Sequence, residues 1–372
     1  MNASPLNLEA CPPESQPTGS FSRQRCFEGV LLGTAVGDAL GLPAENLSPE
    51  RIRRLWHDKW RMRFFLGRGM ISDDTEHTLM VGQALLAQPE DPARFQLTLA
   101  WKFRWWPVGL PAGVGLATAR ACLKLWVGVP ASRSAVASGG SGPAMRSAII
   151  GAFFAEQSEK RREFVLASSR LTHRGWQAET AALAVAEAVS LAAARKGQPP
   201  EASEILPALR NLSPEKEWQQ RLLQLESSLG AQDSVSGFVD RLGLKHGVTG
   251  YSLNVVPVAL YSWLRHRGDF HSCLTAALEC GGDTDTVGAI VGALCGATGG
   301  VESIPREWLE GLWEWPRSTA FMRRLAERLA DQKRAGRALG EVHYFWPGVI
   351  PRNLLFLIIV ILHGFRRLLP PY

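Results

Sequence analysis

The chain carries apolar residues at three- and four-residue spacing over most of its length, a pattern typical of amphipathic α-helices. It is clearest in six segments, at 27–40, 74–87, 176–194, 253–264, 271–279 and 286–298. Runs in which apolar and polar residues alternate, as in half-buried strands, are scarce. With 372 residues, 46% of them hydrophobic, the chain is long enough for a sizeable core. We therefore predict an all-α fold, with one multi-helix domain over residues 23–335.

Three other segments depart from that pattern. Residues 1–22 are rich in Pro, Ser and Asn, and we predict a disordered tail; it lacks the basic start and apolar run of a signal peptide. Residues 196–232 are more polar, and we predict a surface excursion with its own helix at 214–228. Residues 336–372 are predicted to form a linker and an apolar C-terminal helix.

The C-terminal helix has two interpretations. Residues 354–362 are nine unbroken apolar residues, with aromatic residues before them and two arginines after them. A helix that spans a bilayer needs about 20 apolar residues, and the prolines and polar residues at 347–353 interrupt any extension. The segment is therefore predicted either to dock on the domain or to contact a membrane surface through residues 354–369.

Composition narrows the partners and the compartment. The net charge is +6, but Lys and Arg are scattered and no nucleic-acid-binding motif occurs, so we expect no nucleic-acid partner. The six cysteines form no CxxC pair and stand at no zinc-finger spacing. Cys273, Cys280 and Cys295 fall within apolar helical patterns, where a free Cys behaves as a small buried hydrophobe. We therefore expect a reducing, cytoplasmic location.

Two short acidic runs, far apart in the sequence, carry the most informative chemistry. Residues 72–75 read SDDT and residues 281–286 read GGDTDT, and each run stands just before a helical pattern. A helix N-cap is the alternative for the first run, but one cap needs one such residue, and adjacent carboxylates repel one another. Aspartates and hydroxyls are hard oxygen ligands that suit Mg²⁺ and Mn²⁺. Two such runs that face one another would hold a two-metal site.

Small residues recur at every fourth position near both runs. Gly33, Gly37 and Gly41 leave one helix face nearly bare, and glycines at 288, 292 and 296 do the same after the second run; such faces favour close helix–helix contact. Asp38 lies in the first of these helices, where a carboxylate must be paired or bound. Glu45 follows on a loop, where it is a candidate metal ligand or proton-transfer group; a solvated loop carboxylate is the alternative.

Two further segments suit a substrate. Residues 138–146 are rich in glycine and open a helix near 144. Exposed N–H groups in such a loop bind phosphate, although a flexible loop is the alternative. Arg146 would either suit a phosphate or lie on the surface. His173 lies between two helical patterns, where it has a structural role or contacts substrate.

Taken in this order, three motifs closely resemble those of the ADP-ribosylglycohydrolase family: GDALG at 37–41, the run at 72–75, and GGDTDTVGAIVGALCGA at 281–297. The resemblance runs from Arg25 to Gly300. It implies an orthogonal multi-helix, all-α fold with a dinuclear metal cleft that holds two Mg²⁺ ions, or Mn²⁺. The metal ligands that it implies are Ser72, Asp73, Asp74, Asp283, Asp285 and Thr286.

The same resemblance implies the other site residues and the reaction. Glu45 matches a mobile, metal-associated glutamate and would transfer a proton, with Asp74 and Asp285 as the catalytic aspartates. His173 would lie near the ligand and Tyr251 beside its adenosine. The diphosphate would lie against the loop residues Gly139, Gly140, Ser141, Gly142 and Met145. The implied partner is an ADP-ribosylated protein or an ADP-ribose conjugate, hydrolysed at its anomeric carbon.

One departure from the family pattern leaves alternatives open. Some members carry an Asp in a DxG pattern where residues 111–116 here read PAGVGL, so an arginine linkage is in question. The chain could also be a non-catalytic, ADP-ribose-binding or crystallin-like structural member, or a hydrolase of a different ADP-ribose conjugate. The retained acidic residues argue against a non-catalytic role.

Overall fold

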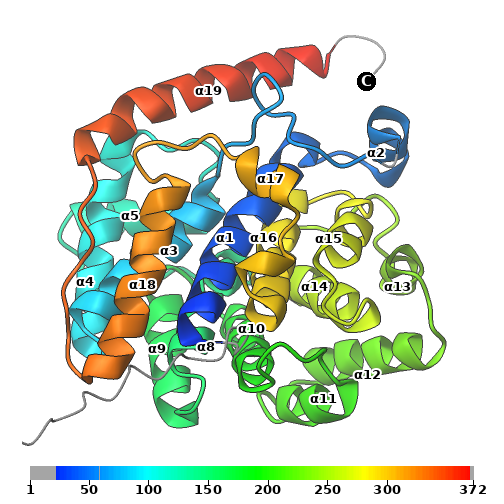
Figure 1. The fold of residues 1–372 in the computed structure, drawn as a ribbon, viewed down its shortest axis with the longest axis horizontal. Helices are drawn as coiled ribbons and strands as arrows, with labels where there is room; N and C mark the ends of the chain where they lie inside the picture. Colours follow the sequence, from blue (N-terminus) through cyan, green and yellow to red (C-terminus); the bar gives the residue numbers. More distant parts are fainter. Residues whose placement is uncertain (1–21, 58, 369–372) are drawn as a thin grey trace, which may run out of the picture.

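The computed structural model describes residues 22–57 and 59–368 (Figure 1). Within these residues the regular elements are helices, with isolated bridges but no strand, so the predicted all-α class is confirmed. The six patterned segments form α1 (Arg23–Gly41), α3 (Asp73–Ala87), α10 (Trp176–Ala194), α14 (Ser252–Arg265), α15 (Phe270–Leu278) and α16 (Thr284–Gly299). Apart from Ser22, the predicted tail at 1–22 lies outside the described residues.

The helices α1 and α16 lie side by side at the centre of the domain, with α3, α4 and α18 on one side and α14 and α15 on the other (Figure 1). The other α-helices are α2 (Pro49–Trp56), α4 (Pro92–Trp105), α5 (Leu116–Trp126), α6 (Ala131–Ser134), α7 (Gly142–Met145), α8 (Ala148–Phe153), α9 (Ser158–Thr172), α11 (Ala202–Arg210), α12 (Lys216–Gly230), α13 (Val235–Arg241), α17 (Arg306–Glu310), α18 (Thr319–Ala335) and α19 (Val349–Arg366). Short 3₁₀ turns stand at η1 (Leu42–Ala44), η2 (Trp106–Gly109), η3 (Val301–Ser303) and η4 (Trp346–Gly348).

The segment 196–232 belongs to the core, and the prediction of a surface excursion was wrong. It forms α11 and α12, and α12 matches the helix predicted at 214–228. Trp218, Leu222 and Leu225 of α12 are fully buried, and α12 packs against α14. These apolar positions follow helical spacing, so one buried face suffices to dock a helix whose composition is polar overall.

Close contact between α1 and α16 determines where the functional site lies. A Cβ on Gly33 would stand 2.2 Å from the Gly292 carbonyl oxygen, and one on Gly37 would stand 1.9 Å from that of Gly288. The paired glycines run in opposite order, so the two helices are antiparallel. The C-terminus of α1, which leads to Glu45, therefore lies beside the N-terminus of α16, which carries the second acidic run.

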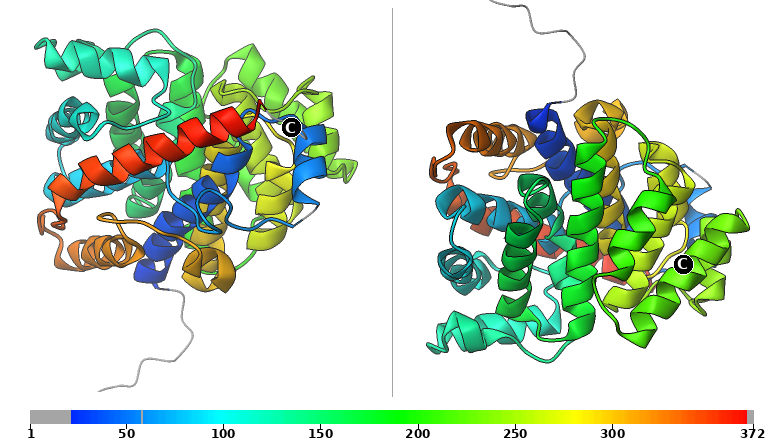
Figure 2. Two further views of the ribbon diagram at one scale, coloured as in Figure 1. Left: turned by 90° about the horizontal axis from the view of Figure 1, so that it is seen from above. Right: turned by 90° about the horizontal axis from the view of Figure 1, so that it is seen from below.

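The C-terminal helix α19 docks on the outer surface of the domain, where it crosses the ends of several helices (Figures 1 and 2). Phe356 and Ile359 are buried in a small apolar cluster with Leu42, Phe64 and Met70. The opposite face leaves apolar side chains exposed at Leu354, Leu357, Ile358, Ile361, Leu362 and Phe365.

Two helical stretches are long and apolar enough to cross a membrane, by length and composition alone. The first, Arg23–Ala44, is 94% buried inside the domain, as expected of a core helix. The second, Trp346–Arg366, is only 33% buried, because its outer face lacks a partner within the described part of the chain.

Candidate active site

A cleft of about 620 Å³ lies where α1, α3 and α16 bring their ends together. Three predicted site residues, Ser72, Gly139 and Tyr251, stand outside its lining. The other predicted site residues line it, namely Glu45, Asp73, Asp74, Gly140, Ser141, Gly142, Met145, His173, Asp283, Asp285 and Thr286. The fold thus gathers segments that are more than two hundred residues apart in sequence.

A tight turn presents the second acidic run. Gly281 and Gly282 have positive φ values of 68° and 82°, which glycine adopts at little steric cost. A Cβ on Gly282 would lie 2.0 Å from the carbonyl oxygen of Val248. The turn is held on both sides, because the Gly282 N–H donates to Leu47 O at 2.9 Å and the Asp283 N–H donates to Val248 O at 2.7 Å. Only glycine allows the chain to pass between these two segments.

The first acidic run is held by Asp38 of α1. The backbone N–H of Ser72 donates to both Asp38 carboxylate oxygens, at 2.9 and 3.1 Å, and the Thr75 N–H donates at 3.2 Å. The Thr75 hydroxyl donates to the same carboxylate. Burial raises the pKa of Asp38 to about 7, although these donors lower it. Asp38 therefore meets the requirement for pairing, and it fixes the start of α3 beside α1.

Within the part of the chain that the structure describes, two buried carboxylate oxygens in the cleft lack a hydrogen-bond partner, namely Oδ1 of Asp74 and Oδ1 of Asp285. The other Asp74 oxygen accepts from the Ser72 hydroxyl at 3.1 Å, and the Thr286 hydroxyl lies 3.5 Å from it. A buried carboxylate oxygen without a donor is costly unless a cation or proton reaches it. The residues therefore fit a divalent cation with hard oxygen ligands.

Repulsion among the acidic groups also favours a bound cation at this site. Burial raises the pKa of Asp74 and Asp285 well above the usual range, and the charges of neighbouring carboxylates raise it further. Burial also raises the pKa of Asp73 and Asp283. Within the described residues no three acidic, His or Cys side chains already form a metal-binding group.

Glu45 stands beside this cluster on the loop after α1. Burial and the charge of Asp283 raise its pKa, whereas Arg367 and the Asn46 amide lower it. The Asn46 side chain donates to Glu45 Oε1 at 3.1 Å. A half-buried carboxylate with few fixed contacts can turn toward or away from a neighbouring cation, and its raised pKa suits proton transfer.

The glycine-rich loop forms another part of the cleft wall. It pairs with the segment before α14, since the Ser252 N–H donates to Gly139 O at 2.9 Å and the Ser141 N–H donates to Gly250 O at 3.1 Å. Tyr251 lies between these contacts and donates to Glu217 at 3.0 Å. The loop is thus anchored on its outer side, and its inner side faces the cleft.

Arg146 matches neither of its two predicted roles. It is fully buried and donates to Gly142 O at 3.0 Å, to Ser168 O at 2.9 Å and to the Thr172 hydroxyl at 2.7 Å. It therefore ties the glycine-rich loop to the end of α9. A buried guanidinium can serve this purpose because its planar donors satisfy several carbonyl and hydroxyl oxygens at once.

His173 faces the loop in its neutral form. Burial and the nearby charge of Arg146 lower its pKa to about 3. Its Nδ1 lies 2.8 Å from the Thr172 hydroxyl, and a Cβ on Gly142 would stand 2.9 Å from its Cε1 atom. His173 can hydrogen-bond a ligand but does not act as an acid near neutral pH.

This depressed pKa makes a testable prediction for stability. Below the ordinary pKa of about 6.5, unfolded His173 takes up a proton that the folded protein does not bind, so stability falls as pH drops from 6.5 toward 3. We expect His173→Gln to remove up to about 1.4 kcal/mol per pH unit of this loss. Urea unfolding between pH 7 and pH 5 measures how the free energy of unfolding changes with pH in each protein. The control His343→Gln, at an exposed position, should keep the wild-type dependence. Parallel profiles for His173→Gln and the wild type would contradict the assignment.

The stretch 111–116 lies at the edge of the cleft, which Gly113, Gly115 and Leu116 line. No acidic residue occurs between Asp91 and Glu156, so this edge offers backbone groups and uncharged side chains. Sequence reasoning missed Asn46, Thr118 and Thr249, which also line the cleft. They belong to no acidic or glycine-rich run, so no local signal marked them.

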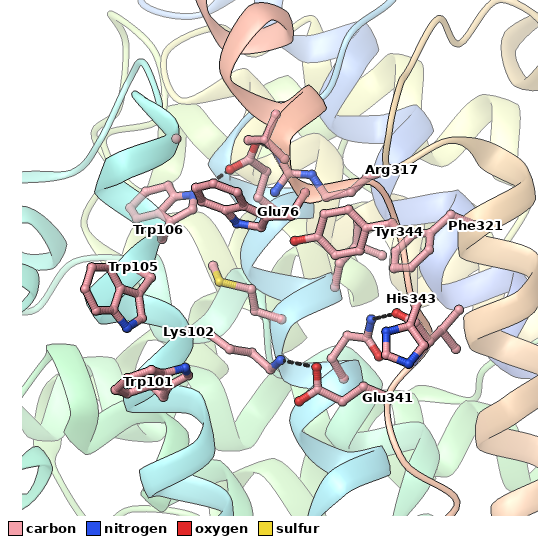
Figure 3. A pocket seen from close by; sticks show the side chains of 17 residues that line it. Glu76, Trp101, Lys102, Trp105, Trp106, Arg317, Phe321, Glu341, His343 and Tyr344 are labelled. Carbon is pink, nitrogen blue, oxygen red and sulfur yellow. Dashed lines mark hydrogen bonds and ion pairs between the residues drawn. The ribbon is translucent and has the colours of Figure 1, made fainter.

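A second cavity of about 370 Å³ lies along α3 from its first turn onward, between the tryptophans of α4 and the segment before η4 (Figure 3). At one end the buried Glu76 accepts hydrogen bonds from the Trp106 indole and the Arg317 guanidinium. At the other end Lys102 Nζ lies 2.6 Å from Glu341. Because Glu76 lies in the first turn of α3, its partners hold the helix that carries the first acidic run.

Comparisons with known proteins agree with this geometry. A family model described as ADP-ribosylglycohydrolase matches residues 20–338. An uncharacterized protein of Archaeoglobus fulgidus is 33% identical over 316 residues, which are 82% of this chain and 96% of that protein. The ADP-ribosyl-[dinitrogen reductase] glycohydrolase of Rhodospirillum rubrum is 27% identical over 301 residues, 79% of this chain and 92% of that enzyme. A solved ADP-ribosylglycohydrolase-related protein complex has a TM-score of 0.56 at 27% identity, covering 83% of this chain and 98% of the matched chain.

The matched residues include both acidic runs, the glycine-rich loop and every helix from α1 to α18, whereas α19 lies beyond them. Over that length the order of the motifs and the helical fold are those that the resemblance implied. The chain therefore belongs to the ADP-ribosylglycohydrolase family and is a hydrolase of glycosidic bonds.

Proposed function

We propose that this chain is a divalent-metal-dependent hydrolase that releases ADP-ribose from a protein side chain or a small acceptor. One observation carries the proposal: two acidic runs meet in one cleft, where Asp74 and Asp285 each keep a buried oxygen without a partner among the described residues. A glycine-rich loop suited to a diphosphate lines the same cleft.

The proposed ligands of two Mg²⁺ ions, or of Mn²⁺, are Ser72, Asp73, Asp74, Asp283, Asp285 and Thr286. Bound there, such ions polarise oxygen atoms and lower the pKa of water. The aspartates would offset the positive charge of the ions. Thr286 and Ser72 would orient these carboxylates through their hydroxyl groups.

The remaining residues would bind and orient the substrate. Glu45 would take a proton at its carboxylate from the attacking water, because burial and the charge of Asp283 raise its pKa and so make it a better base. The loop residues Gly140 to Met145 would hold the diphosphate, which positions the anomeric carbon. Neutral His173 would hydrogen-bond the ligand, whereas Gly139 and Tyr251 would support the loop from behind.

The test is release of free ADP-ribose from arginine-linked, serine-linked and other ADP-ribose conjugates, with and without Mg²⁺ after treatment with a chelator. Release from one linkage, restored by Mg²⁺, is the expected result and names the substrate class. Tight binding of ADP-ribose with no release from any conjugate would overturn the hydrolase and favour the non-catalytic binding role.

For α19 we propose contact with an anionic bilayer surface at the cytoplasmic side of a membrane. Its exposed apolar residues recur at 354, 357, 358, 361, 362 and 365 and form one continuous stripe. The basic Arg366 ends the helix, and the chain carries a net charge of +6. An apolar stripe with basic flanks is typical of helices that lie in the plane of a membrane surface.

The prediction is that Ile358→Glu/Ile361→Glu lowers flotation with vesicles of anionic phospholipid by more than about tenfold, because two side chains lose apolar contact. Leu97→Glu, a change at an equally exposed apolar position of α4, should leave flotation unchanged. Equal flotation of all three proteins would contradict the proposal. If the wild type is a dimer that does not bind vesicles, and the double variant is a monomer, then a second copy of the chain covers the stripe instead.

A further inference from the structure

The face of α19 that packs on the domain carries polar groups that a docking helix does not need. Arg352 and Asn353 are buried, at 7% and 1% exposure, beside the apolar contacts of Phe356 and Ile359. The helix therefore has Arg352 and Asn353 on its inner face and the apolar stripe on its outer face. Buried polar groups of this kind are kept where they have specific partners.

Arg352 and Glu314 together hold the residue that precedes the first acidic run. Arg352 Nη2 donates to the carbonyl oxygen of Ile71 at 2.7 Å, and the Ile71 N–H donates to Glu314 Oε1 at 2.7 Å. The two side chains are paired with each other, with Arg352 Nε 3.1 Å from Glu314 Oε2. Asp38 holds the next N–H, that of Ser72. The backbone entering the run is thus fixed by charged groups from both sides.

The same helix reaches two more segments near the cleft. Asn353 Nδ2 donates to Gly109 O at 2.7 Å, just before the stretch 111–116. Arg367 Nη2 donates to Pro43 O at 3.1 Å, two residues before Glu45. Arg352 Nη1 also lies 3.8 Å from Glu76 in the first turn of α3. One helix therefore contacts the backbone at three places around the site.

We propose that α19 is a positioning element of the active site. Its Arg352, together with Glu314 from the segment between α17 and α18, fixes the backbone at Ile71 so that Asp73 and Asp74 face the metal ions. The inference rests on the proposed metal site. It goes beyond the family resemblance, because the match ends at residue 338 and α19 begins at Val349.

The choice of a buried ion pair supports a positional role over a purely stabilising one. A buried Arg–Glu pair often contributes no more stability than well-packed apolar residues of the same volume, since both charges lose their hydration. What the pair does provide is two directed contacts to one peptide unit, a donor for its carbonyl oxygen and an acceptor for its N–H. Apolar side chains would fill the space but would leave the Ile71 backbone groups unpaired.

The test is the double variant Arg352→Met/Glu314→Gln, which leaves no buried lone charge behind. We expect its affinity for Mn²⁺, measured by electron paramagnetic resonance of the free ion, to fall by about tenfold or more, as for other residues that orient metal ligands. The kcat for ADP-ribose release should fall, whereas KM should change little, because the diphosphate loop is untouched. Arg367→Ala, near the end of α19, should lower kcat without loss of thermal stability.

The matched control is Leu222→Ala. It leaves a cavity beside α12 and destabilises the protein, but Leu222 is not among the residues that line the cleft. It should bind Mn²⁺ as tightly as the wild type. If the wild type binds Mn²⁺ and the double variant binds it equally well, the inference is wrong and the metal site stands. If the wild type binds no Mn²⁺ at all, the metal assignment itself is wrong and this inference falls with it.

Discussion

Asp285→Asn is expected to lower ADP-ribose release by at least about a thousandfold, because loss of one carboxylate removes a cation worth several kcal/mol of transition-state stabilisation. The side chain is buried, and one of its oxygens has no partner among the residues that the structure describes, so Asn fits the same space without its charge. The helical fold should be intact by circular dichroism. Asp240→Asn, at an exposed position of α13, should retain full activity.

The same variant has a second signature that separates metal loss from damage. In the metal-free protein, like charges crowd Asp285, so the neutral amide should raise the melting temperature without metal. Added Mg²⁺ should then raise the melting temperature of the wild type but not of the variant, because only the wild type binds the ion. A variant with wild-type release and a wild-type response to Mg²⁺ would contradict the role of Asp285.

Gly33→Leu is expected to lower the free energy of unfolding by more than about 5 kcal/mol, which is comparable with the whole stability of an ordinary domain. Its Cβ alone would stand 2.2 Å from the Gly292 carbonyl oxygen, and a backbone atom cannot rotate away as a side chain can. The helices α1 and α16 would have to separate along their length and lose their contacts. Denaturant unfolding measures the loss, or the protein fails to fold.

The control for this change is Gly230→Leu at the end of α12, where a Cβ would meet no atom within 4 Å. It should change stability by no more than about 1 kcal/mol, since surface positions of this kind tolerate substitution. A Gly33→Leu protein as stable as Gly230→Leu would show that close contact between α1 and α16 does not determine the fold.

The sequence predicted those parts of the fold and site that local patterns determine. Six helices followed from apolar spacing, and α1 and α16 were each expected to contact another helix closely because their glycines recur at every fourth position, although the sequence did not show that they contact each other. The acidic runs were visible because Ser72 to Thr75 and Gly281 to Thr286 each concentrate several possible ligands in a few residues. The structure places both runs in one cleft, as the hypothesis of a two-metal site requires.

Features that depend on distant partners were not predictable. Arg352 meets Glu314 and Ile71 across 38 and 281 residues, and no local pattern links these positions. Arg146 carried a plausible phosphate role, but its partners on α9 lie 22 and 26 residues away and turn it inward. The segment 196–232 was misplaced because its average polarity hid the helical spacing of Trp218, Leu222 and Leu225.

The C-terminal helix was predicted either to dock on the domain or to contact a membrane surface, and the structure docks it on the domain through one face. Its inner face carries Arg352, Asn353 and Phe356, whereas its outer face carries the apolar stripe. A run of nine apolar residues does not distinguish these faces, because the residues that dock it lie partly outside the run. Only the packing against η1, η2 and the start of α3 shows which face turns inward.

The most direct test of the central claim is anomalous diffraction from crystals of the protein grown with Mn²⁺ and ADP-ribose. We expect two manganese peaks in the cleft, between the Asp73–Asp74 and Asp283–Asp285 carboxylates, with the diphosphate against the glycine-rich loop. Manganese elsewhere on the protein, or a cleft that binds ADP-ribose without any manganese, would contradict this expectation.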